Sequence, residues 1–209
     1  LVRRTRAAME SAYSKLAGYE VPGGGFDWYG RAPAHEELTA YGLLQFADMK
    51  RVHQGIDGAL LGRAAAWLAS RSDGRGGFYR ADRAWTFKNS SDDLRTAYIT
   101  HGVAMAGQTP DPQALAHSAS LARKSDDPYL LALAASTLLA SPGKAEAGRT
   151  AAKRLLAMQQ ADGSWSGAHT ITRSGDYGRV VESTGLAALA LSQAGGHSDA
   201  VDRAVGWLQ

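Results

Sequence analysis

The stretch that decides the fold is residues 129–139, which read YLLALAASTLL. These residues are apolar almost all round, and a helix tolerates that pattern only when neighbouring elements surround it. Residues 184–191 (TGLAALAL) have the same character. Both stretches are therefore predicted to be inner helices, which need a shell of other helices around them.

The segments between such stretches carry one apolar stripe and one polar face. In residues 57–70, Leu60, Ala64 and Leu68 recur at helical spacing, which is typical of a helix that covers a core. Inner and outer patterns alternate along the chain, and we see no convincing strand. Inner helices are predicted over 37–49, 93–106, 129–140 and 181–193, and outer helices over 57–70, 111–124, 144–159 and 198–209. This alternation predicts an all-α fold, an α/α toroid that forms an incomplete ring, as a single domain over residues 1–209.

Capping residues indicate where the helices begin. Asp111, Asp127 and Ser141 each precede a proline, and proline loses no hydrogen bond at the first position of a helix. These three residues are predicted N-caps. Asp57 and one residue of the run 90–93 are predicted to cap two further helices.

A weak internal repeat supports a ring of similar units. A Gly-x-aromatic turn occurs at residues 24–26, 76–78 and 163–165, with separations of 52 and 87 residues, the second close to two periods. Each turn is followed 13 to 19 residues later by a threonine and a small residue, at Thr39, Thr96 and Thr184. Glycine lets the chain reverse, and the aromatic side chain is predicted to plug the end of the barrel. Coincidence in a glycine-rich chain is the alternative.

Composition excludes several functional classes. The 209 residues are enough for one core, and the absence of cysteine excludes disulfides, cysteine-ligated zinc and a cysteine nucleophile. The net charge is only +3, and the charges alternate in sign along the chain, which disfavours nucleic acid as a partner. No apolar run approaches the roughly 18 residues of a membrane span, so we expect no membrane insertion.

Metal and cofactor chemistry finds little support. His35 and Glu36 begin like the HExxH motif, but Thr39 stands where the second histidine ligand is required. The six histidines show no pair at ligand spacing. The sequence therefore predicts neither a metal site nor a cofactor.

An enzyme of the same architecture is the alternative function. In a toroid the inner helices open at one rim, where carboxylates and aromatic platforms like those of an α/α-barrel glycosidase or lyase would gather. The paired acids also read simply as helix caps. The candidates for such a rim are Glu37, Asp92, Asp127 and Glu182, with Trp28, Trp85 and Trp165.

Taken in order, the motifs resemble the thioester domain of the alpha-2-macroglobulin and complement family, especially its bacterial members. The resemblance runs from about residue 10 to the end of the chain, and the order and spacing of the motifs are more specific than any one of them. It rests on GY (18–19), PGGGFDWY (22–29), RAP (31–33), ELTAY (37–41), AWL (66–68), GGF (76–78), TAYIT (96–100), QQADGSW (159–165) and AVGWL (204–208).

The resemblance implies a non-enzymatic module of an endopeptidase inhibitor that traps proteases. Its implied partners are other domains of the parent inhibitor and the target proteases, and its implied location is periplasmic or extracellular. Reactive members of the family carry a Cys-x-Glu-Gln thioester, which these residues do not supply. Complement members place a histidine shortly after the second Gly-Gly-Phe turn, whereas residues 78–86 (FYRADRAWT) have none. Hydroxyl-directed acylation is therefore not expected.

The resemblance also points to a candidate rim near a thioester. Its residues are Phe26, Trp28, Tyr29 and His35. A strained acyl bond must be kept from water until it reacts, so we expect the aromatic members to cover it. The alternative is that these aromatic side chains are only core plugs.

Overall fold

A computed structural model describes residues 2–80 and 90–209, and within these ranges every regular element is a helix. Two isolated bridges, Glu20 with Phe26 and Ser72 with Phe78, are the only extended pairings among these residues. The all-α class predicted from the sequence is confirmed. The helices are α1 (Val2–Ala17), α2 (Glu36–Val52), α3 (Gly58–Ser70), α4 (Asp92–Met105), α5 (Pro112–Lys124), α6 (Pro128–Ala140), α7 (Ala145–Ala157), α8 (Asp176–Ala194) and α9 (Ser198–Leu208).

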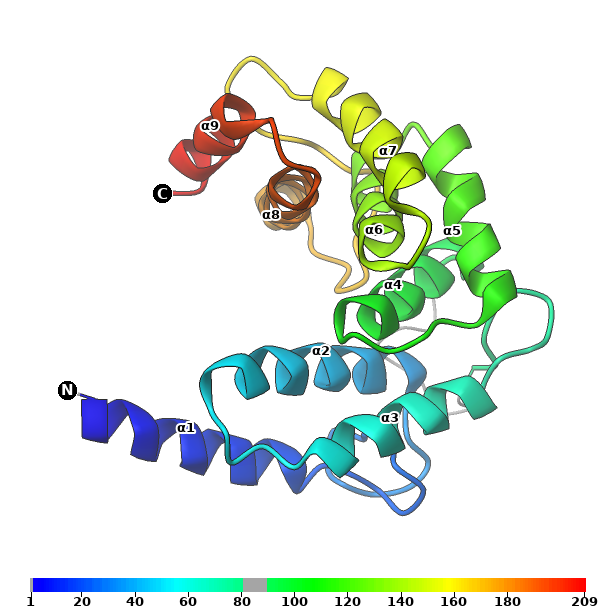
Figure 1. Ribbon diagram of the computed structural model, residues 1–209, viewed down its shortest axis with the longest axis vertical. Coiled ribbons are helices and arrows are strands. Elements are labelled where there is room, and N and C mark those ends of the chain that lie inside the picture. The colour runs from blue at the N-terminus through cyan, green and yellow to red at the C-terminus, as the bar shows by residue number, and fades with distance from the viewer. Residues whose placement is uncertain (1, 81–89) are drawn as a thin grey trace.

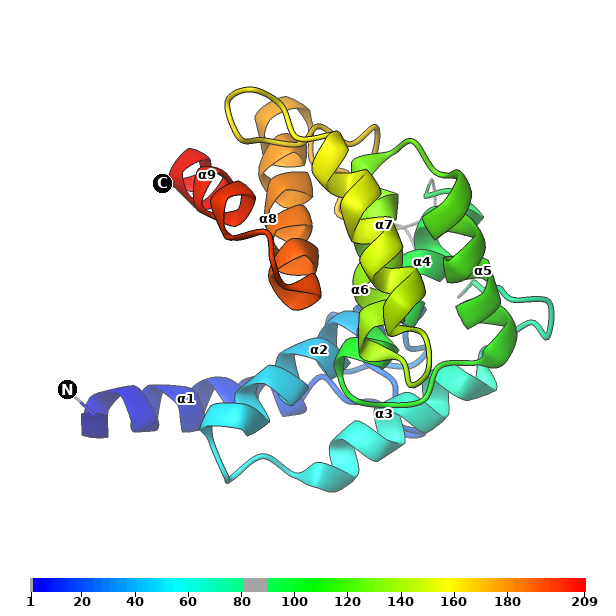
Figure 2. The same cartoon turned by 45° about the horizontal axis from the view of Figure 1, so that its top comes forward.

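The helices follow an open arc in two layers (Figures 1 and 2). Helices α2, α4, α6 and α8 contact one another in that order and form the inner layer. Each is paired with the helix that follows it in the chain, so that α3, α5, α7 and α9 form the outer layer. Helix α1, which the sequence patterns did not place, adds Tyr13 and Leu16 to the core beside α2. The relation of this arc to a complete toroid stays a prediction.

The two stretches expected to be fully enclosed differ in burial. In α6, Leu131, Leu133 and Leu138 are completely buried between α4, α5, α7 and α8. In α8, Leu189 remains 40% exposed. The reason is position, because α6 has inner helices on both sides whereas α8 lies at one end of the described arc.

Most predicted caps are confirmed, and one is wrong. Asp111 and Asp127 accept hydrogen bonds from the first backbone N–H groups of α5 and α6, and Asp57 does the same for α3. Ser91 caps α4. Ser141, however, ends α6, because its hydroxyl donates backward to the carbonyl of Thr137 at 2.7 Å.

Two helix starts also differ from the sequence expectation. Helix α7 begins at Ala145, with Lys144 at its N-cap position, because Gly143 first reverses the chain with φ of 72°. Helix α8 begins at Asp176, five residues before the expected start at 181. The polar stretch 176–179 carries no apolar stripe, so the periodicity did not reveal this first turn.

The three Gly-x-aromatic turns are structurally equivalent. Gly24, Gly76 and Gly163 have φ of 98°, 96° and 96°, a conformation that residues with a side chain rarely adopt. Each of these glycines packs against the next outer helix along the chain, which is α3, α5 or α9. A Cβ on Gly24 would lie 2.6 Å from the carbonyl oxygen of Arg63, and one on Gly163 would lie 2.7 Å from that of Arg203. The internal repeat is therefore a structural one.

In two of the three turns a threonine of the inner helix holds the aromatic residue. The backbone N–H of Phe26 donates to Thr39 Oγ1 at 2.9 Å, and that of Trp165 donates to Thr184 Oγ1 at 3.0 Å. Thr39 lies in the first turn of α2, whereas Thr184 lies in the middle of α8, because that helix begins earlier than the sequence pattern predicted. The connection from α5 to α6 is short and has no such turn, which accounts for the longer second separation.

Candidate functional site

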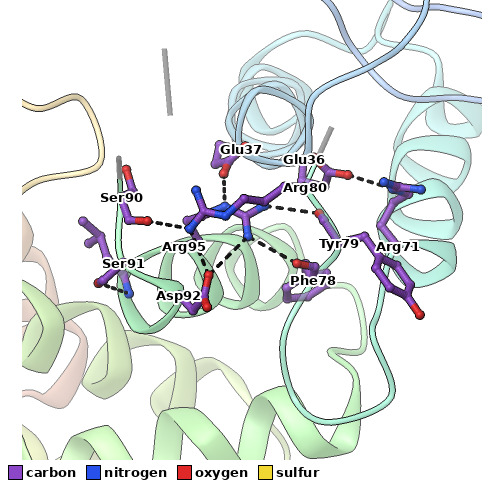
Figure 3. Close-up of polar contacts among 11 residues, drawn as sticks. Glu36, Glu37, Arg71, Phe78, Tyr79, Arg80, Ser90, Ser91, Asp92 and Arg95 are labelled. Carbon is purple, nitrogen blue, oxygen red and sulfur yellow. Dashed lines mark hydrogen bonds and ion pairs between the residues drawn. The ribbon is translucent and has the colours of Figure 1, made fainter. Parts of the chain in front are cut away.

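The amino-terminal end of α2 carries two buried carboxylates. Glu36 and Glu37 are 0% and 1% exposed. Glu36 accepts a hydrogen bond from Nε of Arg71 at 2.7 Å, and Glu37 accepts one from Nε of Arg95, which is itself buried (Figure 3). Each acid is thus paired with an arginine from a different part of the chain, as buried charges require.

Arg95 also fixes the segment that follows the second turn. Its two terminal nitrogens donate to the carbonyl oxygens of Phe78 and Tyr79, both at 3.2 Å. Arg80, next along that segment, donates to the carbonyl of Ser90 at 2.6 Å and to Asp92 at 2.9 Å (Figure 3). This cluster links α2, α4 and the segment after the second turn, so its contacts have a structural role.

Arg71 and Arg95, on which this cluster depends, were not among the residues predicted from the sequence. The sequence does carry a signal for Arg95, because this residue lies within 93–106, a stretch expected to form an inner helix. A charged residue inside such a helix needs a partner.

The second oxygen of Glu37, Oε2, is buried and has no hydrogen-bond partner among the described residues. The pairing satisfies the charge but not every lone pair.

A second buried pair lies just before α2. His35 is 5% exposed, and its Nε2 lies 3.3 Å from Oδ2 of Asp27. The other oxygen of Asp27 accepts from the backbone N–H groups of Tyr29 and Arg31 at 2.9 and 3.0 Å. Burial alone would raise the pKa of Asp27, but these hydrogen bonds and the nearby His35 outweigh it, so the pKa lies below its usual value.

An apolar groove of about 300 Å³ opens beside this pair, between the end of α1 and the face of α2. Its walls are mostly apolar, and Asp27 is its one acidic lining residue among those described. Trp28 and Tyr41 remain 45% and 48% exposed, so the groove presents aromatic surface to solvent. The described lining residues are Leu16, Tyr19, Phe26, Asp27, Trp28, Leu38, Tyr41, Gly42, Gln45 and Phe46.

The four candidate rim residues occupy different environments. Phe26 and Trp28 line the groove, Phe26 being almost fully buried. His35 lies behind the groove wall, against Asp27, and its Nδ1 is buried without a partner. Tyr29 is 83% exposed and is not part of the groove. Their role near a thioester stays a prediction.

The carboxylates named for an enzyme are all engaged in ion pairs or hydrogen bonds with other groups of the chain. Glu37 is paired with Arg95, and the side chain of Asp92, which is 87% exposed, is paired with Arg80. Asp127 caps α6, and its second oxygen accepts from the N–H of Ala168 at 2.9 Å. Glu182 accepts from the hydroxyls of two residues in the loop before α8, Thr172 and Ser174.

Of the three tryptophans named with those carboxylates, the two that the structure describes do not form a common platform. Trp165 is completely buried and donates from Nε1 to the carbonyl of Leu155 at 2.8 Å. Trp28 lines the groove beside α2. Trp85 lies outside the described residues. Trp165 therefore acts as the core plug that the turn motif predicted.

Across residues 2–80 and 90–209, no group of three or more histidine, aspartate or glutamate side chains is arranged to hold a metal ion. No helix in the same ranges has the length and apolarity needed to cross a membrane.

Comparison with known proteins gives the fold and little more. No protein-family model matches the chain, and no curated protein matches it. Among solved structures, the chain is similar to a protein from Actinoplanes known from a crystal structure, with 18% sequence identity and a TM-score of 0.60. The similarity covers 95% of this chain and 63% of that protein, so the chain spans less than two thirds of its length. At this identity the likeness shows a shared fold alone.

Proposed function

We propose that this chain is a non-catalytic binding module of an alpha-2-macroglobulin-like endopeptidase inhibitor. The observation that carries the proposal is the aromatic groove beside Trp28, which offers exposed apolar surface for contact with another polypeptide segment. Exposed apolar patches of this kind mark interaction sites. The motif order described above supports the choice of family, and the periplasmic or extracellular location is proposed with it.

The state of the carboxylates supports binding over catalysis. A glycosidase needs two carboxyl groups that face the substrate, one to donate a proton and one to act as nucleophile or base. Glu37 is buried in an ion pair, and the carboxylate of Asp127 accepts three backbone N–H groups, those of Tyr129, Leu130 and Ala168. The apolar groove holds only one carboxylate among its described lining residues. The enzyme alternative, a glycosidase or lyase, has correspondingly less support.

The test of protease trapping uses the full-length polypeptide that contains this chain. It is incubated with an endopeptidase, and cleavage of a large protein substrate is compared with cleavage of a small peptide substrate. A trapping inhibitor is expected to suppress cleavage of the protein while the peptide is still cleaved. Equal cleavage of the protein with and without the inhibitor contradicts the proposal, and release of sugars from a polysaccharide panel favours the enzyme instead.

The groove itself is tested by Trp28→Ala in the same full-length polypeptide. If the groove covers a thioester, the variant is expected to react faster with methylamine, because loss of the indole admits solvent and amine. Trp207→Ala is the matched control, since that indole packs against Tyr177 at the far end of the arc. An unchanged reaction rate in Trp28→Ala removes the protective role.

A further inference from the structure

A second cavity, of about 460 Å³, lies between the start of α4 and the loop that leads into α8. It is separate from the aromatic groove, and none of its described lining residues is acidic. Polar and basic side chains from three parts of the chain meet there. They include Ser90 and Ser91 before α4, His169 and Arg173 in the loop, and Arg179 in the first turns of α8.

Two hydrogen-bonding groups of this cavity are buried without a partner. Ser90 is only 6% exposed, and its hydroxyl has no hydrogen-bond partner within residues 2–80 and 90–209. Nε of Arg179 is equally shielded and unpaired, although another nitrogen of the same guanidinium donates to the carbonyl of Ala168 at 3.1 Å. A buried donor without a partner destabilises the folded chain, because it has lost its hydrogen bonds to water. Two such donors on one cavity indicate that a ligand with hydrogen-bond acceptor atoms could bind there.

The charges around the cavity favour a negatively charged acceptor. Arg173 and Arg179 both line it, and α4 directs its amino-terminal end toward it, with Ser91 as the cap. The first N–H groups of a helix carry a partial positive charge, which favours anions at that end. Figure 3 shows Ser90 and Ser91 together at this end of α4.

Four carboxylates lie near the cavity. Asp92 and Asp93 occupy the first turn of α4 and are paired with Arg80 and His117. The other two, on the far side, are also engaged. Glu182 accepts from the hydroxyls of Thr172 and Ser174, so the Ser174 hydroxyl is committed to that acid. Asp127 accepts from the N–H of Ala168. Neither acid is bonded to Ser90, Arg173 or Arg179 in any hydrogen bond or ion pair of the described residues.

We propose that this cavity binds the oxyanion of a phosphate or sulfate ester on a small molecule. The donors come from α4, from the loop and from α8, so they approach the centre from separate directions, which suits a tetrahedral group with three outer oxygens. Arginine guanidinium groups are well matched to such oxygens. The cavity is larger than inorganic phosphate requires and leaves room for the rest of an ester. This site is independent of the proposed inhibitor function.

The test measures binding to the 209-residue chain by titration calorimetry. The probes are inorganic phosphate, phenyl phosphate and sodium acetate. The wild-type chain is expected to bind phenyl phosphate more tightly than phosphate and to bind acetate least. Arg179→Gln is expected to weaken phenyl phosphate binding at least tenfold, because it removes the charge and the unpaired donor.

Two further variants keep the result interpretable. Ser90→Ala removes a hydroxyl that has no partner among the described residues, so it is expected to leave the unfolding temperature unchanged or to raise it slightly, and to weaken binding several-fold. Arg149→Gln is the control, because Arg149 pairs with Glu146 on the exposed face of α7. No binding of either phosphate probe, equal weakening by Arg149→Gln, or acetate binding as tight as that of phenyl phosphate overturns the proposal.

Discussion

The two halves of the arc bury different kinds of polar group. Among the described residues, every buried charged or histidine side chain lies between positions 27 and 101. These residues are Asp27, His35, Glu36, Glu37, Arg95 and His101. From position 118 onward the buried polar side chains are all serine or threonine. The amino-terminal half is therefore held in part by ion pairs, and the carboxy-terminal half by packing and hydroxyl contacts.

The difference follows from what each group needs as a partner. A buried hydroxyl in a helix can donate to a carbonyl four residues earlier, as Thr137 does to Leu133 at 2.7 Å. It needs no residue from another element. A buried charge needs an opposite charge, which for Glu37 comes from Arg95 on another helix. The amino-terminal half thus depends more on contacts between elements, and it is the half that acid should affect first.

The largest expected effect comes from breaking the buried ion pair. Arg95→Met leaves Glu37 charged, buried and without its counterion, and we expect a loss of about 4 kcal/mol in the free energy of unfolding. Arg154→Met is the matched change in the other half. Arg154 is partly exposed and donates mainly to backbone carbonyls of Ala122 and Ser125, so we expect about 1 kcal/mol there.

Urea denaturation of both variants measures the difference. The double variant Glu37→Leu with Arg95→Met is expected to recover much of the lost stability, because it removes both charges rather than one. Equal losses from Arg95→Met and Arg154→Met would show that the two halves do not differ in the way proposed.

A smaller effect is expected from acid. Burial lowers the pKa of His101 to about 4, despite a hydrogen bond to the backbone carbonyl of Leu133 that favours the charged form. In the unfolded chain the histidine pKa is about 6.5. Between these values the unfolded state binds a proton that the folded state does not, so stability is full above pH 6.5 and falls as the pH drops toward 4. The total is about 3 kcal/mol at 1.36 kcal/mol per pH unit.

The measurement is the unfolding free energy of the wild type and of His101→Gln at several pH values from 8 to 4. The variant is expected to lose the part of the slope that begins near pH 6.5. Asp27 contributes little to the slope between pH 6.5 and 5, because its pKa is lowered and its stabilising charge persists to more acidic pH. Identical slopes in both proteins rule out His101 as the source.

The smallest effect is expected from the hydrogen bond between a helix threonine and a turn N–H, which occurs in both halves. Thr184→Val and Thr39→Val each remove the acceptor for a turn N–H, that of Trp165 or Phe26. We expect each to lower the unfolding free energy by about 1–2 kcal/mol, since a buried N–H is left unpaired. Ser136→Ala is the control, because that buried hydroxyl has no partner and its loss should be neutral or stabilising. A markedly larger loss from only one of the threonine variants would break the equivalence of the two turns.

The sequence predicted the fold better than it predicted the site. The apolar stretch 129–139, the caps at Asp111 and Asp127 and the glycine turns depend on neighbours within a few residues, and these predictions were confirmed. The Ser141 cap was wrong because a hydroxyl before proline can equally donate back to the preceding helix. The partner of Glu37 lies 58 residues away, and no local pattern specifies such a pairing.

By itself the sequence determined the class of the fold, the order of inner and outer helices and the positions where glycine must reverse the chain, because these follow from local periodicity and backbone sterics. The tertiary structure alone decided which charges are paired, which aromatic side chains face solvent and which donors meet in the cavity beside α4. Those outcomes depend on residues far apart in the chain that only packing brings together. A carboxylate such as Glu37 therefore reads as a candidate acid in the sequence and as half of a buried ion pair in the folded protein.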